Sequence, residues 1–380
     1  MGERLTFLVA AALSSIAGAL ALGWLIPLPP AAHIHLALAA GMMPLILGAM
    51  LHFAPVLTRS AAPAPPIRLL PWLAQGGGIL ATLAFLFPGF LVAGRNLAAI
   101  SALAAAATLA VWMWRRGRQT LGSPHPSLNW YLAALACLML ALLAVLAMHP
   151  WPEHSLALKR LHLHLNLLGL IGLTAVGTVQ VLLPTAAGRG DAQVAGRLRQ
   201  DLRFALAATL SVAVGAAAIP GLAWAGLALW LLPLYRMLAA WLKLYPAEIF
   251  AWHGAVPSLA AAALGLTLAL LAGALHAAGH IQAGGAGHMF ILAFLLPLVT
   301  GAVSQLLPLW LRPGAQTPWH GETRQRLGRW SGIRALLFMG GGIAAAAGWR
   351  AGVPLAGLGL AWFIAQLLAA LTYSARIQVE

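Results

Sequence analysis

The stretch HLALAAGMMPLILGAMLHFAP, residues 35–55, recurs twice along the chain with its key residues in the same register. The related stretches are HLNLLGLIGLTAVGTVQVLLP, residues 164–184, and HMFILAFLLPLVTGAVSQLLP, residues 288–308. In each stretch a Gly follows the first His by thirteen residues, and a Pro follows that Gly by seven. Because seven residues make about two helical turns, we expect Gly and Pro to share one face, where Gly admits a close neighbour and Pro ends the span. The aligned residues are His35, His164 and His288, then Gly48, Gly177 and Gly301, then Pro55, Pro184 and Pro308.

The distance between these stretches predicts a repeated module of four helices. The aligned histidines are 129 and 124 residues apart, and each interval holds four apolar runs long enough to cross a bilayer. We therefore predict an all-α polytopic membrane protein with about twelve transmembrane helices, forming one domain over 1–380 with repeats of about 1–127, 128–254 and 255–380. The predicted spans are 5–27, 32–55, 67–90, 96–114, 128–148, 161–185, 202–219, 221–242, 255–278, 287–311, 331–349 and 352–374.

The charge of the chain fits a membrane topology better than a nucleic-acid partner. The 380 residues are 62% hydrophobic and 8% charged, with a formal net charge of +15. With a cytoplasmic N-terminus, most of the 22 Lys and Arg residues fall in cytoplasmic loops, and only Arg95, Lys159, Arg160 and Arg350 fall in the opposite ones. This asymmetry predicts a bacterial-type inner membrane protein with both termini in the cytoplasm, whose positive charge contacts anionic lipid.

The composition excludes several kinds of metal site. A single cysteine, Cys137, allows no internal disulfide, no Cys-ligated iron–sulfur cluster and no two-thiolate copper site. The seven Asp and Glu residues fall near span ends or in loops, which argues against a di-iron carboxylate site or a carboxylate proton relay inside the bilayer. Imidazole is the remaining ligand within the spans.

Five histidines are the candidate cofactor and metal ligands. His35, His164 and His288 begin the three aligned stretches, and His33 and His162 precede two of them by two residues. Residues at i and i+2 are about 200° apart around a helix, so each His-x-His pair points to two sides. Imidazole ligands in a membrane span suit a bis-His haem, a five-coordinate haem or a His copper site, and the residues alone leave these open.

The other histidines have simpler explanations. His276 and His280 lie at a helix end or in a loop, and are secondary candidates as extra ligands or partners of haem propionates. His52 lies deeper in its span, where it serves either a hydrogen bond between helices or a second site. We expect the remainder to be interfacial or loop residues: His125, His149, His154, His253 and His320.

Twelve helices in three groups of four, with histidines on the second, sixth and tenth, resemble subunit I of the haem-copper oxidases. The second span, with HIH at 33–35 followed by Gly48, His52 and Pro55, is similar to the tenth helix of those oxidases, and MPLILGA at 43–49 is similar to their second. A closer resemblance is to the NnrS family, haem- and copper-containing membrane proteins linked to nitric oxide stress, whose His-x-His helix shares this frame. The resemblance implies haem b, copper or both, with electron transfer or chemistry on a diatomic gas.

The functional expectation is a haem- or copper-binding membrane protein that handles nitric oxide or dioxygen, with a quinol or an electron-donor protein as a partner. In this hypothesis His35 and His288 bind one haem, and His33, His162 and His164 hold a second haem or copper. A proton-pumping oxidase is not expected, because the seventh span, DLRFALAATLSVAVG at 201–215, has no adjacent His pair. The alternatives are a transporter or channel for a transition metal or porphyrin, and a structural subunit whose histidines bond to one another. Whether the protein is an oxidoreductase stays open.

Overall fold

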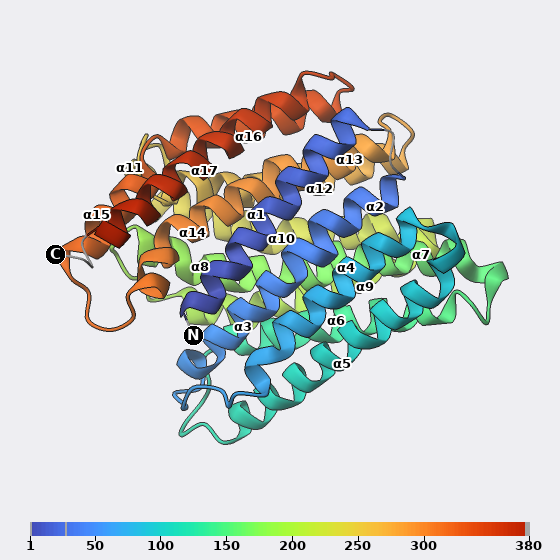
Figure 1. Cartoon of the computed structure of the whole chain (residues 1–380), viewed down its shortest axis with the longest axis horizontal. Helices are drawn as coiled ribbons and strands as arrows, with labels where there is room; N and C mark the ends of the chain where they lie inside the picture. The colour runs from blue at the N-terminus through green and yellow to red at the C-terminus, as the bar shows by residue number, and fades with distance from the viewer. Residues whose placement is uncertain (1, 27–28, 377–380) are drawn as a thin grey trace. The chain divides into compact units, whose positions relative to one another are not determined.

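The computed structural model describes residues 2–26 and 29–376, and every regular element in this part of the chain is a helix. Most are α-helices, and the η elements are π- or 3₁₀-helical segments (Figure 1). In the first part the elements are α1 Gly2–Leu25, α2 Pro30–Ile34, η1 His35–Met42, α3 Met43–Leu57, η2 Ile67–Leu69, α4 Leu70–Leu86, η3 Pro88–Phe90, α5 Leu91–Arg118, α6 Ser127–Ala147, η4 Pro152–His154, α7 Ser155–His164 and η5 Leu165–Leu173. They continue with α8 Thr174–Ala186, α9 Val194–Ala217, α10 Pro220–Leu244, α11 Pro246–Ile249, α12 Val256–Ala277, α13 Ala283–His288, η6 Met289–Leu295, α14 Leu296–Leu311, α15 Pro318–Gly328, α16 Ser331–Ala346 and α17 Gly352–Arg376.

Within the described residues, ten helical stretches are long and apolar enough to cross a membrane. They coincide with ten of the twelve predicted spans, so the chain is a polytopic all-α membrane protein by helix length and composition. The other two predicted spans, 202–219 and 331–349, are helical but fall short. The first belongs to α9, whose opening turns carry Arg197, Asp201 and Arg203. The second is α16, whose 16 residues reach about 24 Å, less than the roughly 30 Å of a bilayer core.

The contacts divide the chain into two compact units. The first comprises Glu3–Thr178 and Gln193–Trp230, and the second comprises Val179–Ala192 and Leu231–Glu380. In the first unit, η1 and α3 pack on α4, α4 packs on α5, α5 packs on α6, and α6 packs on α7 and η5 (Figure 1). In the second unit, η6 packs on α12 and α16, and α16 packs on α17. The chain passes between the units after Thr178, Ala192 and Trp230, all inside the second predicted repeat and not at a repeat boundary.

Three π-helical segments interrupt the helices that carry the aligned histidines. The segment η1 begins at His35, η5 begins directly after His164, and η6 begins directly after His288. A π-helix bonds each amide to the carbonyl five residues earlier, which widens the helix, and such segments are frequent at functional sites. In all three stretches a π-helical segment thus begins at the aligned histidine or directly after it.

The three aligned glycines have the packing role that their spacing predicts. A Cβ at Gly48 would lie 2.5 Å from a side-chain atom of Leu8, and one at Gly177 would lie 2.6 Å from Trp130. At Gly301 the neighbour is Ser258, at 3.0 Å. Each glycine therefore admits a close neighbour that a side chain would displace.

The prediction that the aligned prolines end their helices is wrong. Pro55, Pro184 and Pro308 lie inside α3, α8 and α14, which continue to Leu57, Ala186 and Leu311. Proline removes one amide donor and disturbs the preceding turn, but the residues after it can still bond to earlier carbonyls. Each of the three helices continues for two or three residues after its proline and then ends.

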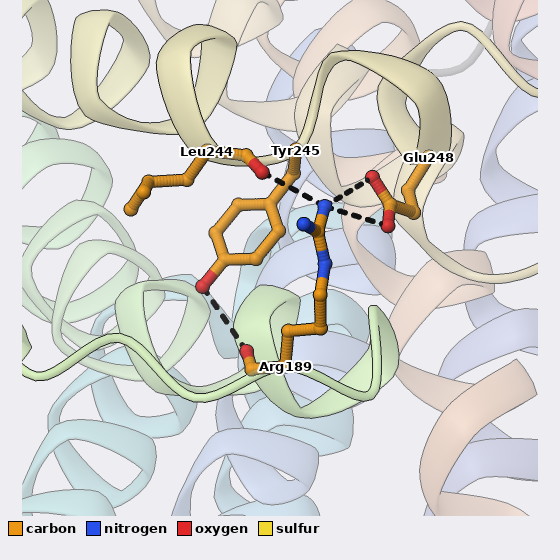
Figure 2. A network of polar contacts seen from close by, with 4 residues as sticks. All are labelled: Arg189, Leu244, Tyr245 and Glu248. Atoms are coloured by element: carbon orange, nitrogen blue, oxygen red, sulfur yellow. Dashed lines mark hydrogen bonds and ion pairs between the residues drawn. The ribbon is translucent and has the colours of Figure 1, made fainter.

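Beyond α8, Arg189 joins the end of this helix to the α10–α11 corner in the second unit (Figure 2). Its Nη2 atom donates to both carboxylate oxygens of Glu248, at 2.8 and 2.9 Å, and to the carbonyl of Leu244 at 2.8 Å. The guanidinium lies 5.2 Å from the centre of the Tyr245 ring, whose hydroxyl donates to the Arg189 carbonyl. Arg189, which follows the second aligned stretch by five residues, thus has a structural role.

Candidate functional site

Two of the aligned histidines, His35 and His164, share one hydrogen-bonding arrangement. The Nδ1 atom of His35 lies 2.7 Å from the carbonyl of Ala31, and that of His164 lies 2.8 Å from the carbonyl of Arg160. Because a carbonyl only accepts, each ring donates to the residue four positions earlier. A neutral imidazole that donates in this way carries its lone pair on Nε2, the tautomer that binds metals when Nδ1 is anchored.

His35 and His162 are brought together within the first unit. Their ring centroids are 6.3 Å apart and their planes are inclined by only 9°. His162 is anchored as His35 is, with Nδ1 3.1 Å from the carbonyl of Ala141 on α6. Two imidazoles that bind one metal ion from opposite sides, through bonds of about 2.0–2.1 Å, have ring centres roughly 6 Å apart. The 6.3 Å between the two ring centres matches this spacing.

Two neighbours complete the surroundings of the pair, and the sequence analysis missed both. The Phe85 ring on α4 lies 4.7 Å from the His35 ring, inclined by 36°. The amide nitrogen of Asn166 donates to the His162 carbonyl at 2.8 Å and lies 3.2 Å from its Nδ1. A polar residue inside an apolar span is itself a signal of function, so Asn166 was detectable. Phe85 was not, because its contact depends on how α4 packs.

His33 points to a different helix from His35, as expected from its position two residues earlier. A Cβ at Gly23 on α1 would lie 3.6 Å from two atoms of the His33 ring. The Nε2 atom of His33 is buried and has no hydrogen-bond partner. The first His-x-His pair thus presents one imidazole to α1 and the other to His162 and Phe85.

The expected pairing of His35 with His288 stays a prediction, and within the first unit His35 has a different neighbour. His35 lies beside His162, a residue that we had grouped with His33 and His164. His288 belongs to the second unit, at the junction of α13 and η6, and is described with that unit. No group of three or more His, Cys, Asp or Glu side chains is arranged to hold a metal ion among residues 2–26 and 29–376. Among the described residues, the His35–His162 pair is therefore the candidate arrangement of metal ligands.

The secondary candidates have local contacts with residues other than the His35–His162 pair. His276 and His280 are exposed near the end of α12, and the His276 ring bonds to the carbonyl of Ile281 at 3.0 Å. His52 is half-buried near the end of α3, with its ring 5.1 Å from that of Phe53. Neither contact is with another candidate ligand.

An apolar groove of about 670 Å³ lies beside the helix that carries His162. It is formed by α6, α7, η5 and α9, and its lining includes Leu140, Ala144, Trp151, Leu161, Leu165 and Val214. Aliphatic and aromatic side chains of this kind accommodate hydrocarbon and offer no group for acid–base chemistry. We therefore place the candidate chemistry at the His35–His162 pair and not in the groove.

The fold and the site define an all-helical membrane protein with two anchored, parallel imidazoles between neighbouring helices of one unit. Comparison with known protein families and with curated proteins finds no match to the chain.

Proposed function

We propose that the chain is a haem- or copper-binding membrane protein, similar to the NnrS family, with a redox role or a role in handling nitric oxide or dioxygen. The observation that carries this proposal is the His35–His162 pair, with parallel rings 6.3 Å apart. Both rings donate from Nδ1 to backbone carbonyls, so both Nε2 atoms carry lone pairs. In each ring Nε2 is then the atom available to bind a metal ion.

The residues around the pair suit the task of holding a cofactor. The carbonyls of Ala31 and Ala141 fix the two ring orientations and increase the basicity of the ligand nitrogens. Asn166 anchors the backbone of His162, and Phe85 covers one side of His35 with an apolar ring. Haem iron or copper held by both rings would supply one-electron transfer, and copper held there would also leave a binding position for a diatomic gas.

Features of the backbone support the remaining parts of the proposal. The π-segments after His35, His164 and His288, and the close contacts at the aligned glycines, favour the plan of three repeated four-helix modules. In this plan His33, His164 and His288 are available as ligands of a second haem or copper. A quinol or an electron-donor protein would supply electrons, and both termini would lie in the cytoplasm of a bacterial-type cell.

A transporter for a transition metal or porphyrin is the second candidate. The buried, unpartnered Nε2 of His33 favours it, because this atom offers another imidazole position on the same helix as His35. A transported ion would pass from one such ligand to the next, whereas a resident cofactor would stay on the pair. Metal-dependent uptake into proteoliposomes would support transport.

The absorption spectrum of the purified protein, combined with elemental analysis, tests the cofactor proposal. We expect a Soret band that shifts on reduction with dithionite, or copper bound in a fixed ratio to protein. A protein purified from haem- and copper-replete cells with neither would overturn the proposal. Metal uptake by proteoliposomes without a resident cofactor would select the transporter instead.

A further inference from the structure

A cluster of five arginines, four exposed and one half-buried, lies at one end of the first unit, where three connections meet. The guanidinium of Arg59, after α3, donates to the carbonyl of Leu121 in the α5–α6 loop at 3.5 Å. The same loop is tied to the end of α3, since the His125 amide donates to the carbonyl of Leu57 at 2.9 Å. The start of α9 is held beside α6, because Trp130 Nε1 donates to the carbonyl of Leu198. We call this cluster the basic rim: Arg59, Arg115, Arg116, Arg118 and Arg199.

Acidic residues are scarce in the part of the sequence that forms most of the basic rim. The sequence contains no Asp or Glu between Glu3 and Glu153. Glu153 follows the far end of α6, a helix of 21 residues and thus about 30 Å long. Asp201, two residues after Arg199, is fully buried. No ion pair in the described part of the chain involves an arginine of the rim.

Aromatic and aliphatic side chains lie among these charges. The guanidinium of Arg116 lies 5.5 Å from the centre of the Trp112 ring, and that of Arg118 lies 5.7 Å from the Trp114 ring. Trp114 is 54% exposed, and Leu121, in the adjoining loop, is 89% exposed. Tryptophan beside arginine at the end of a membrane-crossing helix is typical of the headgroup level of a bilayer.

We propose that the basic rim binds the phosphate headgroup of an anionic phospholipid. Arginine forms paired, directional hydrogen bonds to phosphate oxygens, and stacking on tryptophan restricts the guanidinium to few orientations. The exposed side chains of Trp114 and Leu121 would contact the hydrocarbon just below the headgroup. A soluble phosphate compound makes no use of these apolar side chains, so the surface favours a lipid. The proposal is independent of the cofactor.

Lipid binding to the full-length protein in an uncharged detergent tests this proposal. The probes are phosphatidylglycerol, phosphatidylcholine with the same acyl chains, and inorganic phosphate, with binding measured by native mass spectrometry and by the thermal midpoint. We expect binding of phosphatidylglycerol in clear preference to the other two. Replacing Arg115, Arg116 and Arg118 together with Gln should weaken binding by on the order of 100-fold, given the attraction of each basic residue to an anionic surface.

Two further variants keep the test decisive. Replacing the same three residues with Lys retains the charge and should retain binding within about tenfold, even where the Gln variant folds poorly. Replacing Lys159 and Arg160, in the middle of α7, removes charge near the other end of α6 and should leave binding unchanged. Equal binding of both lipids, or unchanged binding by the Gln variant, would overturn the proposal. Tight binding of inorganic phosphate that displaces the lipid would also overturn it and would indicate a site for a soluble anion.

Discussion

The imidazole rings of His35 and His162 lie parallel, with 6.3 Å between their centroids, although 127 residues separate them in the chain. Each ring is oriented by a hydrogen bond from Nδ1 to a backbone carbonyl, of Ala31 in one case and Ala141 in the other. The backbone thus holds each ring in one orientation, as it does for anchored histidine ligands in metal sites. This relationship is the basis of the cofactor proposal.

The contact between Gly78 and the π-segment η1 predicts a large difference between two glycines on one helix. A Cβ at Gly78 would lie 2.1 Å from the carbonyl oxygen of Ala39, whereas one at Gly76 would have no atom within 4 Å. Gly78→Ala should lower the free energy of unfolding by about 1–3 kcal/mol, because backbone has to move to make room. Gly76→Ala should be neutral or slightly stabilising, since alanine favours a helix. Denaturant or thermal unfolding of both variants checks this, and equal effects would contradict the packing described.

The Arg189–Glu248 pair should contribute modestly to stability and lose its effect in salt. The Arg189 side chain is 56% exposed and that of Glu248 is 29% exposed, so water screens the pair. A double-mutant cycle with Arg189→Ala and Glu248→Ala should give a coupling of about 0.5–1 kcal/mol, falling at high ionic strength. The exposed His154–Glu153 pair, with 3.8 Å between its charged atoms, serves as a control with coupling near zero. A coupling that salt leaves unchanged would show that charge is not its origin.

His125 should make the protein less stable in mild acid. Burial lowers the pKa of His125 below its ordinary value of 6.5, and Arg199 lowers it further. The unfolded chain therefore binds the proton more readily, so this contribution to stability is complete above about pH 6.5 and is lost as the pH falls toward the folded pKa. In the neutral ring, Nδ1 accepts a hydrogen bond from the Ser127 amide at 3.3 Å.

The matched variant is His125→Asn, whose side-chain oxygen can accept the same bond but does not titrate. Its thermal midpoint should fall less than that of the wild type between about pH 7 and pH 5. Identical slopes for the two proteins would show that His125 titrates alike in the folded and unfolded states.

Much of the helical plan was predictable because it depends on local sequence. Long apolar runs define the spans, and the glycine register identified positions of close packing, as the contact of Gly177 with Trp130 confirms. The π-segments were not predictable, since a stretch such as 165–173 is uniformly apolar and its hydropathy does not distinguish hydrogen-bonding patterns. Burial of Asp201 was missed as well, because its neighbours in sequence are charged and suggest a helix end at the surface.

The candidate site was predictable only in part. The His-x-His spacing correctly placed His33 and His35 toward different neighbours, because it depends on helix geometry alone. The partner of His35 is determined by how η1, α4, α6 and α7 pack in three dimensions. Repeat register could nominate His162, His164 and His288 as candidates, but it could not choose among them. The roles of His164 and His288 stay predictions.

Metal content of histidine variants tests the central claim most directly. His35→Ala, His162→Ala and the double variant are purified beside the wild type, with His154→Ala as an exposed histidine control. If one ion is shared, each single variant should lose bound iron or copper by more than tenfold, and the double variant should lose little more, because two ligands of one ion act as a unit. His154→Ala should retain the wild-type content. Folded His35→Ala and His162→Ala proteins with undiminished iron and copper would contradict the account.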